Sequence, residues 1–535
     1  MERVISLPLI ILFVLLPLAF SPLTYHPGTL SYTLILLFIP LAFFQYCFLL
    51  FKDKIKLKFS SLYWLVFLHS FFLLLTLSFS PYFYLTAGAT LLYFLFFLLF
   101  FLSSQGLEAE EEKFYLFSLV PVIITFFLQL AGLPIGGAGF TSTLGQKNLF
   151  ALYLSISSLF LVKAFLEKRI RILFYILYPL LIFAIIFSRS RSGWLTFVLM
   201  NTLYFYFLSP KRIRRIIRHI FILVFLLLIS LILINFLLRY REFTKPERLT
   251  IPFRLYVWKS GWKMFLARPL LGWGRDAFPY VFPSYREKGL ERFVSSDVTM
   301  APRAHNEYLQ VLVEEGIVGF ILFLLFWILI LKQCWDKKEF FKFSLISGLL
   351  FHGLFSVSLR YPLFLFLLYY FGGKVISLKE KTVSRWGKVL FLLSSGVVLI
   401  VSTAVNFRMT WADYYLQKGV VLGQRGKIEE AEFYMEKALT LNPFSPSILY
   451  KLGKIEFLRK KYDKAEYLYK KLIFLAGDYV EVHANLARVY FMKGEFEKAI
   501  KELEIEERLH PGLEKYKIMK NILLRLKDKG NFSAP

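Results

Sequence analysis

"YFYLTAGATLLYFLFFLLFFL", residues 82–102, is an apolar run without a single charged side chain. As an α-helix it is long enough to cross the hydrocarbon core of a bilayer, which takes about 20 residues. Similar runs recur from the N-terminus to about residue 403, and the 535-residue chain is 57% hydrophobic with 61 Phe. That composition is too apolar for a soluble protein of this length. The sequence therefore predicts an all-α, polytopic helical membrane protein.

Twelve or thirteen membrane spans are expected. We place them near residues 4–20, 29–50, 61–79, 82–102, 114–132, 147–165, 171–187, 191–208, 218–237, 306–331, 343–359, 361–377 and 387–404. The first run lacks a signal-peptide cleavage pattern and leads straight into further spans, so we interpret it as an anchor. Cys47 and Cys334 fall on or near the expected cytoplasmic side, and no disulfide is predicted.

The formal charge of +28 is distributed unevenly along the chain. With the N-terminus inside, 23 basic residues fall in short inner loops and four in short outer loops. The inner ones lie within 52–58, 113, 163–171, 211–218, 332–342 and 374–388, and the outer ones are Lys147, Arg189, Arg191 and Arg360. This is the positive-inside bias of membrane proteins. The charge therefore indicates orientation in a membrane, with lipids rather than nucleic acid as partners.

A second type of sequence begins after residue 405, where Lys, Glu, Tyr, Ala and Leu recur at helical spacing. A 34-residue period relates Gly419, Gly453 and Ala487; Ile428, Tyr462 and Phe496; and Ala431, Ala465 and Ala499. Small residues at such a period let paired helices stack closely. The pattern resembles three tetratricopeptide repeats over 412–515 with a final helix near 516–527. We divide the chain into a membrane domain, 1–405, and an α-solenoid repeat domain, 406–535.

Thirteen spans would put this repeat domain outside the cytoplasm, in the periplasm if there are two membranes. Helical solenoids commonly bind peptides or helices, so a protein partner on the repeats is expected. The other large non-membrane segment, 238–305, would be outside as well. It carries Arg239, Arg241, Arg248, Arg254, Arg268, Arg275, Arg286, Arg292 and Arg303. Within it, residues 253–267 space Trp258, Trp262 and Phe265 as on one helix face, which predicts a helix at the membrane–water interface.

Four polar features interrupt the apolar pattern, and the expected topology puts all of them on the outer side. They are Lys147 and Asn148 in "GQKNLF", Arg189 and Arg191 in "SRSRSGW", Arg254 in the interfacial helix, and His305 with Asn306 at the start of the tenth span. They come from positions far apart in the chain. Because successive spans run in opposite directions, the expected topology nevertheless places all four at the same depth. Convergence of this kind is what a site requires.

The arginine pair has two interpretations. Arginine near the end of a span is costly unless it reaches the headgroups, pairs, or faces a polar cavity. It could therefore be anchoring a tight turn. Alternatively, a guanidinium fork matches phosphate oxygens, and Arg191 lies near a helix N-terminus whose dipole also favours anions. Positive charge on an outer turn opposes the orientation bias, which favours the anion-binding interpretation.

His305 also has a simple and a functional interpretation. Asn306 is a good N-cap, so the pair could be no more than a helix start. That account gives no reason for the histidine, however. It also leaves Glu314 and Glu315 unexplained on an expected membrane span. A neutral imidazole can accept a proton from a sugar hydroxyl as a general base.

The motifs together resemble the O-antigen ligase family, also called the O-antigen polymerase C-terminal domain family. The resemblance covers about residues 60–375. It rests on His305-Asn306 followed after nine residues by Gly316-Ile317-Val318-Gly319, on "SRSRSGW", on Arg254-x-x-x-Trp258 with Gly272-x-Gly274, and on "GQKN". Many members carry Leu where this chain has Trp258. Glycines three residues apart, as at 316 and 319, also allow close helix approach.

The resemblance implies a membrane glycosyltransferase of the GT-C kind, metal-independent and inverting, with no cofactor. Its donor would be a glycan on an undecaprenyl-diphosphate carrier. His305 would activate the acceptor hydroxyl, while Arg191 and Arg254 would bind the diphosphate and stabilise its charge as it leaves. Further expected substrate contacts are Arg189, Asn148, Lys147, Asn306 and Trp258.

The acceptor separates several alternatives. A ligase transfers the glycan to lipid A-core, and a polymerase transfers it to another carrier-linked unit. One large outer loop, 238–305, favours the ligase, because polymerases of this family tend to have two that carry arginine. Transfer to a protein hydroxyl is a further alternative, with the repeat domain as recruiter. A transporter or assembly scaffold is the non-enzymatic alternative, for which His305 and Arg191 would be dispensable.

Overall fold

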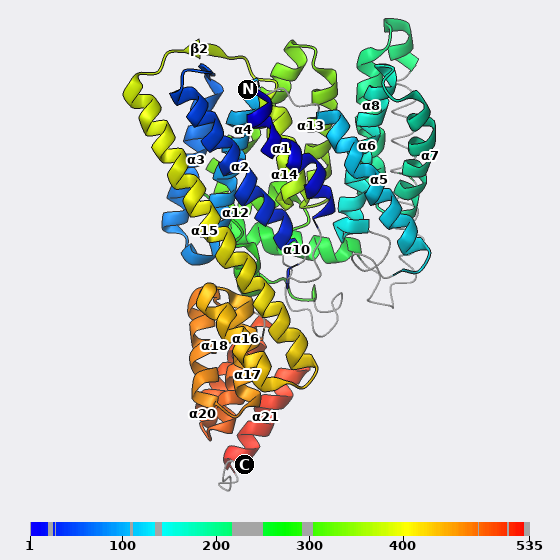
Figure 1. Ribbon diagram of the computed structural model, residues 1–535. Helices are drawn as coiled ribbons and strands as arrows, with labels where there is room; N and C mark the ends of the chain where they lie inside the picture. The colour runs from blue at the N-terminus through cyan, green and yellow to red at the C-terminus, as the bar shows by residue number, and fades with distance from the viewer. Residues whose placement is uncertain are drawn as a thin grey trace.

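The computed structural model describes residues 2–19, 25–26, 28–106, 111–133, 142–216, 230, 250–290, 303–479, 481–510 and 513–528. The expected span at 218–237 lies almost entirely outside them, as do Arg239, Arg241, Arg248 and Arg292. The described chain is almost entirely helical, which confirms the all-α expectation (Figure 1). Seven of its helices are long and apolar enough to cross a membrane. The chain is thus a membrane-embedded helical bundle followed by helical repeats.

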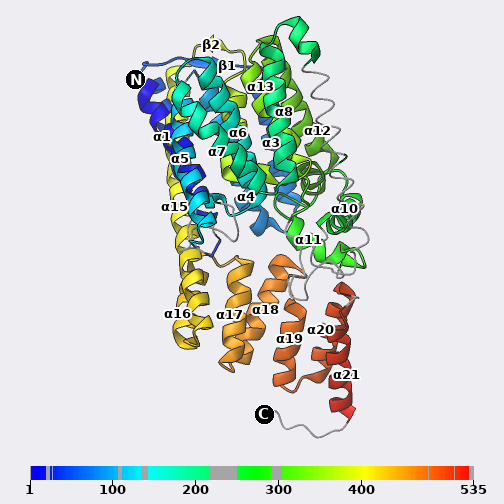
Figure 2. The same cartoon turned by 90° about the vertical axis from the view of Figure 1, so that its right-hand side faces the viewer.

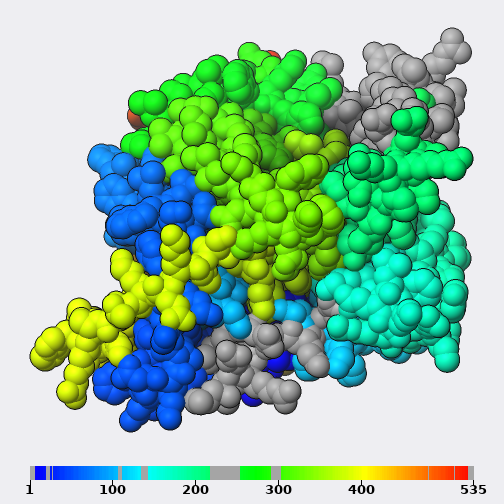
Figure 3. Space-filling model, turned by 90° about the horizontal axis from the view of Figure 1, so that it is seen from above, coloured from blue at the N-terminus to red at the C-terminus, as the bar shows by residue number. Residues whose placement is uncertain are grey.

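The membrane domain is an irregular bundle. Its first half contains α1 (Glu2–Leu15), η1 (Leu16–Leu18), α2 (Thr29–Phe51), β1 (Leu57–Phe59), α3 (Leu62–Phe79), α4 (Phe83–Ser104), α5 (Glu111–Leu130), η2 (Ser142–Leu144), α6 (Lys147–Leu166), α7 (Arg171–Phe187) and α8 (Arg191–Leu208). Its second half contains α10 (Thr250–Ala267), α11 (Phe278–Tyr285), α12 (Glu307–Asp336), α13 (Phe340–Gly353), η5 (Ser358–Arg360), α14 (Pro362–Gly373) and β2 (Lys379–Lys381). β1 and β2 form an antiparallel pair that the sequence did not predict, at the end facing away from the repeats (Figure 1). Figure 3 looks onto this end, where the yellow segment that contains β2 lies beside the blue part of the chain.

The last membrane helix does not stop where the composition changes. α15 (Arg385–Gln424) has 40 residues and so runs for about 60 Å, and the expected domain boundary at residue 405 falls inside it. Its first part packs along α2, and its last part is the first helix of the repeat domain (Figure 1). Asp413 ties the second part to the start of α2, because it accepts hydrogen bonds from the His26 backbone N–H at 3.0 Å and the Thr29 hydroxyl at 2.6 Å.

The repeat domain stacks paired helices, as the 34-residue period predicts. They are α16 (Ile428–Leu441), α17 (Pro446–Leu458), α18 (Tyr462–Ala476), α19 (Val482–Met492), α20 (Phe496–Leu509) and α21 (Glu514–Asp528) (Figure 2). The recurring small residues lie where helices touch. A Cβ on Gly419 would come within 2.7 Å of Met435, and one on Gly453 within 2.7 Å of the Tyr469 ring.

The repeat domain packs against one end of the bundle, the same end that carries α10 and α11 (Figures 1 and 2). The ring of Tyr84 on α4 stacks on Phe444, with 4.4 Å between centroids. The hydroxyl of Ser284 on α11 donates to the Asp478 carboxylate at 2.6 Å. The solenoid therefore contacts both a membrane helix, α4, and α11 in the non-membrane segment between α8 and α12.

α12 is broken near its start. Gly316 has φ 65° and ψ −169°, which no α-helix contains. In an unbroken helix the Ile317 N–H would bond to the Val313 carbonyl. Here it donates instead to Pro269 at 2.8 Å, and the Val313 carbonyl accepts from the Trp273 N–H at 3.2 Å. The loop after α10 therefore completes the hydrogen bonding that the break leaves open.

Glycine is required on both sides of this contact because backbone meets backbone. The Glu314 carbonyl accepts from the Gly274 N–H at 2.8 Å. A Cβ on Gly316 would lie 2.3 Å from the Leu270 carbonyl oxygen, and one on Gly272 would lie 2.4 Å from the Glu314 carbonyl carbon. The loop cannot reach the broken turn if either position carries a side chain.

Gly319 lies where α12 approaches another helix, α3. A Cβ there would lie 2.8 Å from the Phe72 ring on α3 and 2.4 Å from the Glu315 Cβ. Gly319 therefore admits a neighbouring helix, as the sequence predicts for the glycine pair, whereas Gly316 admits a loop.

We expect Gly316→Ala to lower the thermal unfolding midpoint of the detergent-solubilised protein clearly. A non-glycine residue in this region of φ and ψ costs about 1–3 kcal/mol, and the clash with Leu270 adds to it. Gly88→Ala is the matched control, because a Cβ there meets nothing within 4 Å and alanine favours the helix. Equal midpoints for the two variants would contradict this account of the break.

Candidate functional site

Two of the polar motifs meet at the starts of α6 and α8. Ser190 is the N-cap of α8: its hydroxyl oxygen accepts from the Gly193 N–H at 3.2 Å. The same hydroxyl donates to Oδ1, the side-chain amide oxygen of Asn148, at 2.8 Å. A Cβ on Gly193 would lie 2.2 Å from that of Ala151, so glycine lets the two helix starts come together. "GQKN" and "SRSRSGW" thus form one corner.

The two arginines of this corner differ in environment. Arg191 is the first residue of α8 and half-buried, whereas Arg189 is exposed in a left-handed turn with φ 51°. Lys147, the first residue of α6, is also exposed. Of the three expected cations of this corner, Arg191 is the one enclosed by protein.

Arg254 on α10 faces this corner. It is half-buried, and its Nη1 donates to the Phe355 carbonyl oxygen at 3.0 Å. Burial and the nearby charge of Arg191 both lower the pKa of its guanidinium. Within the described residues no carboxylate pairs with either Arg191 or Arg254. Two half-buried cations therefore lie within electrostatic reach of each other without a counterion from those parts of the chain.

His305 completes the group. Burial and, second to it, the charge of Arg254 lower the pKa of its imidazole to about 4, so the ring is neutral near pH 7. The ring meets Phe253 edge-on, with 6.4 Å between centroids. No hydrogen bond reaches its nitrogens from the parts of the chain that the structure describes. The described residues therefore leave both nitrogens without a hydrogen-bond partner.

The backbone at His305 is strained and held by its neighbours. Its φ of 55° lies in the left-handed region, which costs an ordinary residue roughly 1–3 kcal/mol. The indole of Trp258 donates to the Ala304 carbonyl at 2.9 Å, and the Asn306 side chain accepts from the Leu309 N–H at 3.0 Å as the N-cap of α12. Trp258 and Asn306, both expected as substrate contacts, thus brace this turn. They also line an open cavity of about 670 Å³ beside α10.

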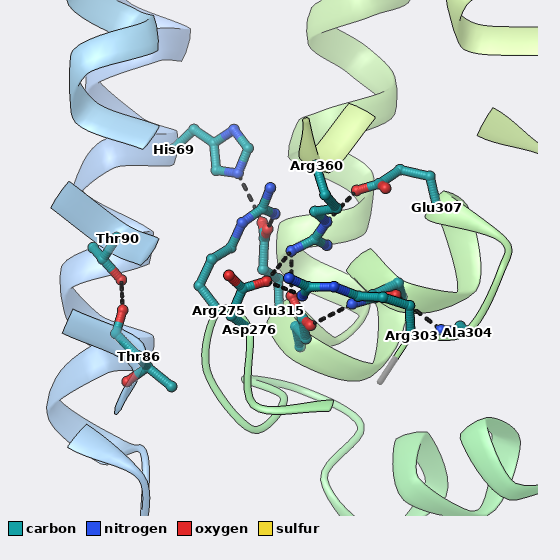
Figure 4. A network of polar contacts seen from close by, with 12 residues as sticks. His69, Thr86, Thr90, Arg275, Asp276, Arg303, Ala304, Glu307, Glu315 and Arg360 are labelled. Carbon is teal, nitrogen blue, oxygen red and sulfur yellow. Dashed lines mark hydrogen bonds and ion pairs between the residues drawn. The ribbon is translucent and has the colours of Figure 1, made fainter. Parts of the chain in front are cut away.

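Sequence reasoning missed a buried ionic network beside this turn (Figure 4). It consists of the cations Arg275, Arg303 and Arg360, the carboxylates Asp276, Glu307, Glu314 and Glu315, and His69 from α3. The two glutamates left unexplained on the expected span are two of its anions. A pattern of glutamates on an apolar helix signals buried cations, but their identity depends on the fold.

A buried histidine near Arg254 was also missed. His352 on α13 is fully enclosed, and its Nδ1 lies 2.9 Å from the Ser358 hydroxyl. It lies within electrostatic reach of Arg254, and its Nε2 has no partner among the described residues. A lone histidine in the apolar run 343–359 was its signal in the sequence.

One group of carboxylates has a geometry that could hold a metal ion. Glu432, Glu436 and Glu456 lie together in the repeat domain. The ammonium groups of Lys461 and Lys464 lie against them, at 2.6 Å from Glu432 and 2.6 Å from Glu456 respectively. The Arg459 guanidinium also pairs with Glu432, so three cations face the three carboxylates, as in an ion-pair network rather than a cation site.

Fold and site together define a polytopic membrane protein in which two half-buried arginines, paired with no carboxylate of the described residues, lie near a neutral histidine at one end of the bundle. Residues 176–324, which contain Arg191, Arg254 and His305, match the model of the family described as O-Antigen ligase. Residues 412–445 and 456–505 match two tetratricopeptide-repeat models. The chain therefore carries an O-antigen ligase-type region and tetratricopeptide repeats.

Over 240 residues the chain is 28% identical to a protein of Acinetobacter baylyi described as a ComP-specific O-oligosaccharyltransferase. This similarity covers 42% of the present chain and 42% of that protein, so it spans less than half of either.

Titration of ¹⁵N-labelled histidines by NMR tests the electrostatics of the site. We expect the His305 ring to stay neutral down to about pH 4, because burial and Arg254 both oppose its protonation. Arg254→Ala removes the repelling cation and should raise this pKa toward 6.5. His305→Gln assigns the signal by deleting it. A pKa of 6.5 or above in the parent protein would contradict the geometry described.

Proposed function

We propose that this protein transfers a preassembled glycan from an undecaprenyl-diphosphate carrier to an acceptor hydroxyl at the outer face of a bacterial inner membrane. Arg191 and Arg254 bind the diphosphate, and His305 is the general base. The O-antigen ligase match over residues 176–324 supports the reaction class. The repeat domain, at the same end of the bundle as this site, is then extracytoplasmic, as the distribution of positive charge also predicts.

The observation that carries this proposal is the contrast between two sets of arginines. Arg275, Arg303 and Arg360 each pair with at least one carboxylate. Arg191 and Arg254 pair with none among the described residues, although they repel each other and are half-buried. Uncompensated cations enclosed by protein are costly, and a bound dianion relieves that cost. A diphosphate has the charge and the oxygen geometry that paired guanidinium groups recognise.

The chemistry follows from these positions. The His305 imidazole takes the proton of the acceptor hydroxyl while its oxygen attacks the anomeric carbon. The bond from that carbon to the diphosphate oxygen breaks, and configuration inverts. Negative charge grows on the leaving diphosphate, where Arg191 and Arg254 stabilise it more strongly than in the bound donor. The protein's own cations supply this stabilisation, so we propose a reaction that needs no metal.

Lipid A-core is the acceptor that the sequence favours, and the alternative within the family is a second carrier-linked glycan. A protein hydroxyl is favoured by a specific observation: the repeat solenoid packs against α4 and α11, beside the site. A solenoid placed there is suited to hold a polypeptide acceptor. The Acinetobacter relative, described as an O-oligosaccharyltransferase, supports the same alternative.

We expect the full-length protein in liposomes, given undecaprenyl-diphosphate glycan and lipid A-core without added metal, to release undecaprenyl diphosphate and glycosylate lipid A-core. His305→Ala should abolish both, because the acceptor hydroxyl loses its base. Mass spectrometry of carrier and acceptor measures the two products. Elongated carrier-linked glycan would identify a polymerase, and donor use only with added protein acceptor would identify a protein transferase. Full turnover by His305→Ala would refute the mechanism.

Arg191→Ala and Arg254→Ala should each weaken donor binding and lower kcat/KM by about 10- to 100-fold, as expected for a lost charge-assisted contact of about 1.5–3 kcal/mol. Arg189→Ala should have a smaller effect, because that side chain is exposed. Arg385→Ala is the control: it removes an exposed arginine at the opposite end of the bundle and should change nothing. Kinetics over a range of donor concentrations give the comparison. Equal losses for Arg191→Ala and Arg385→Ala would contradict the anion site.

A further inference from the structure

The turn that carries His305 is held at almost every residue. Arg303 pairs with the Asp276 carboxylate. The Ala304 N–H donates to the Gln310 side chain at 3.0 Å, and the Gln310 amide in turn donates to Glu314 at 2.9 Å. His305 itself has no such contact among the described residues. Its ring is therefore oriented through the backbone on either side.

Arg360, from the junction between α13 and α14, joins the two sides of this turn (Figure 4). Its Nε donates to Glu307, two residues after the histidine, at 2.7 Å. Its Nη1 donates to Glu314 at 2.7 Å and to Asp276 at 3.3 Å. Asp276 in turn holds Arg303, two residues before the histidine. One guanidinium group thus connects both flanks of His305, and its side chain is only 5% exposed.

Electrostatic attraction between Arg360, Arg303 and their carboxylate partners holds this connection together. Burial opposes ionisation of Asp276, but Arg303 and Arg360 outweigh it and lower the pKa of its carboxyl to about 2. Burial likewise opposes the charge of Arg360, yet Glu307, Glu314 and Asp276 raise its pKa. Near pH 7 the Asp276 carboxyl is therefore ionised and pairs with both arginines. Such buried ion pairs add little net stability, because the cost of desolvation offsets their attraction.

We propose that Arg360 is a positioning residue, which holds the strained backbone of His305 in the orientation that the reaction requires. The proposal rests on the function proposed above, because it gives the histidine a role that needs accurate placement. It assigns to the α13–α14 junction a part in the reaction although Arg360 need not touch substrate. In other sites a carboxylate orients the imidazole ring of the catalytic histidine directly. Here Arg360 orients the backbone that carries the histidine.

Arg360→Lys is the main test. Lysine keeps the charge but has no planar fork, so it cannot hold Glu307, Glu314 and Asp276 together. We expect kcat to fall by about 100-fold, since misplacing a reacting group by about 1 Å has such an effect, while KM for the undecaprenyl-diphosphate glycan changes little. Asp276→Asn should act in the same direction. Because the two residues work as one unit, the double variant should lose little more than the worse single variant.

Arg275→Lys is the matched control. Arg275 is equally buried, pairs with Glu315 and stacks on the Tyr93 ring at 3.3 Å. No hydrogen bond or ion pair connects it directly to residues 303–307 in the described structure. A purely structural role predicts that both lysine variants lose stability and that the active fraction alone falls. The thermal midpoint and the folded fraction by gel filtration are therefore measured for each variant, and kcat is expressed per folded protein.

A fall in kcat per folded molecule for Arg360→Lys and Asp276→Asn, but not for Arg275→Lys, supports positioning. Equal kcat for the two lysine variants, or a change confined to donor KM, would overturn it. His305→Gln, run in the same assay, separates this proposal from the function on which it depends. If His305→Gln retains parental activity, the proposed function fails first. If it is inactive while Arg360→Lys is as fast as the parent, the positioning proposal alone fails.

Discussion

The backbone exchange between the broken start of α12 and the loop 269–274 is the constraint on which the rest of the site depends. Ile317 and Val313 give up their mutual hydrogen bond and bond to Pro269 and Trp273 instead. In a membrane, unpaired backbone groups are tolerated only where other protein satisfies them. The break and the loop therefore require each other. With the loop fixed in this way, α10 and Arg254 are fixed at one side of it, and Arg275 and Asp276 at the other.

Two electrostatic environments meet at His305. On one side, arginines and carboxylates neutralise each other and hold backbone in place. On the other, Arg191 and Arg254 have no carboxylate among the described residues, and His305 is neutral beside them. Any carboxylate that reached the second group would both occupy the arginines and raise the affinity of the histidine for a proton. By pairing with Glu307 and Glu314, Arg360 therefore keeps these acids away from Arg191, Arg254 and His305.

The parts of this structure that depend on local sequence could be predicted, and the parts that depend on distant partners could not. Apolar runs such as 82–102 predict helices because a bilayer leaves the backbone no alternative. The 34-residue period predicts the solenoid, because each small residue lies at a helix contact. The hydrogen bond between His69 and Glu315, by contrast, joins positions 246 residues apart. The sequence around either residue does not indicate the other as its partner. Sequence analysis could therefore note Glu315 as a glutamate without an explanation, but could not find its partner.

Two further differences have equally physical reasons. The boundary at residue 405 rests on a change of composition, yet no proline or glycine between 397 and 418 interrupts the helix, so α15 continues through it. That Arg191, Arg254 and His305 lie on the same side could be predicted from the alternating direction of the spans and from the motifs. How exposed each side chain is could not be predicted in this way. That Arg191 is enclosed while Arg189 is exposed depends on the left-handed turn at residue 189, which places the two side chains differently.

Because α15 is one unbroken helix, it connects the membrane domain and the solenoid rigidly. A helix transmits rotation as well as distance: each added residue lengthens it by 1.5 Å and turns everything beyond it by about 100°. The distance of the repeats from the membrane domain and their rotation about the α15 axis therefore depend on the number of residues between the last turn packed on α2 and Asp413. An insertion or deletion in this stretch would turn the solenoid away from its contacts with Tyr84 and Ser284 without altering a residue of the site.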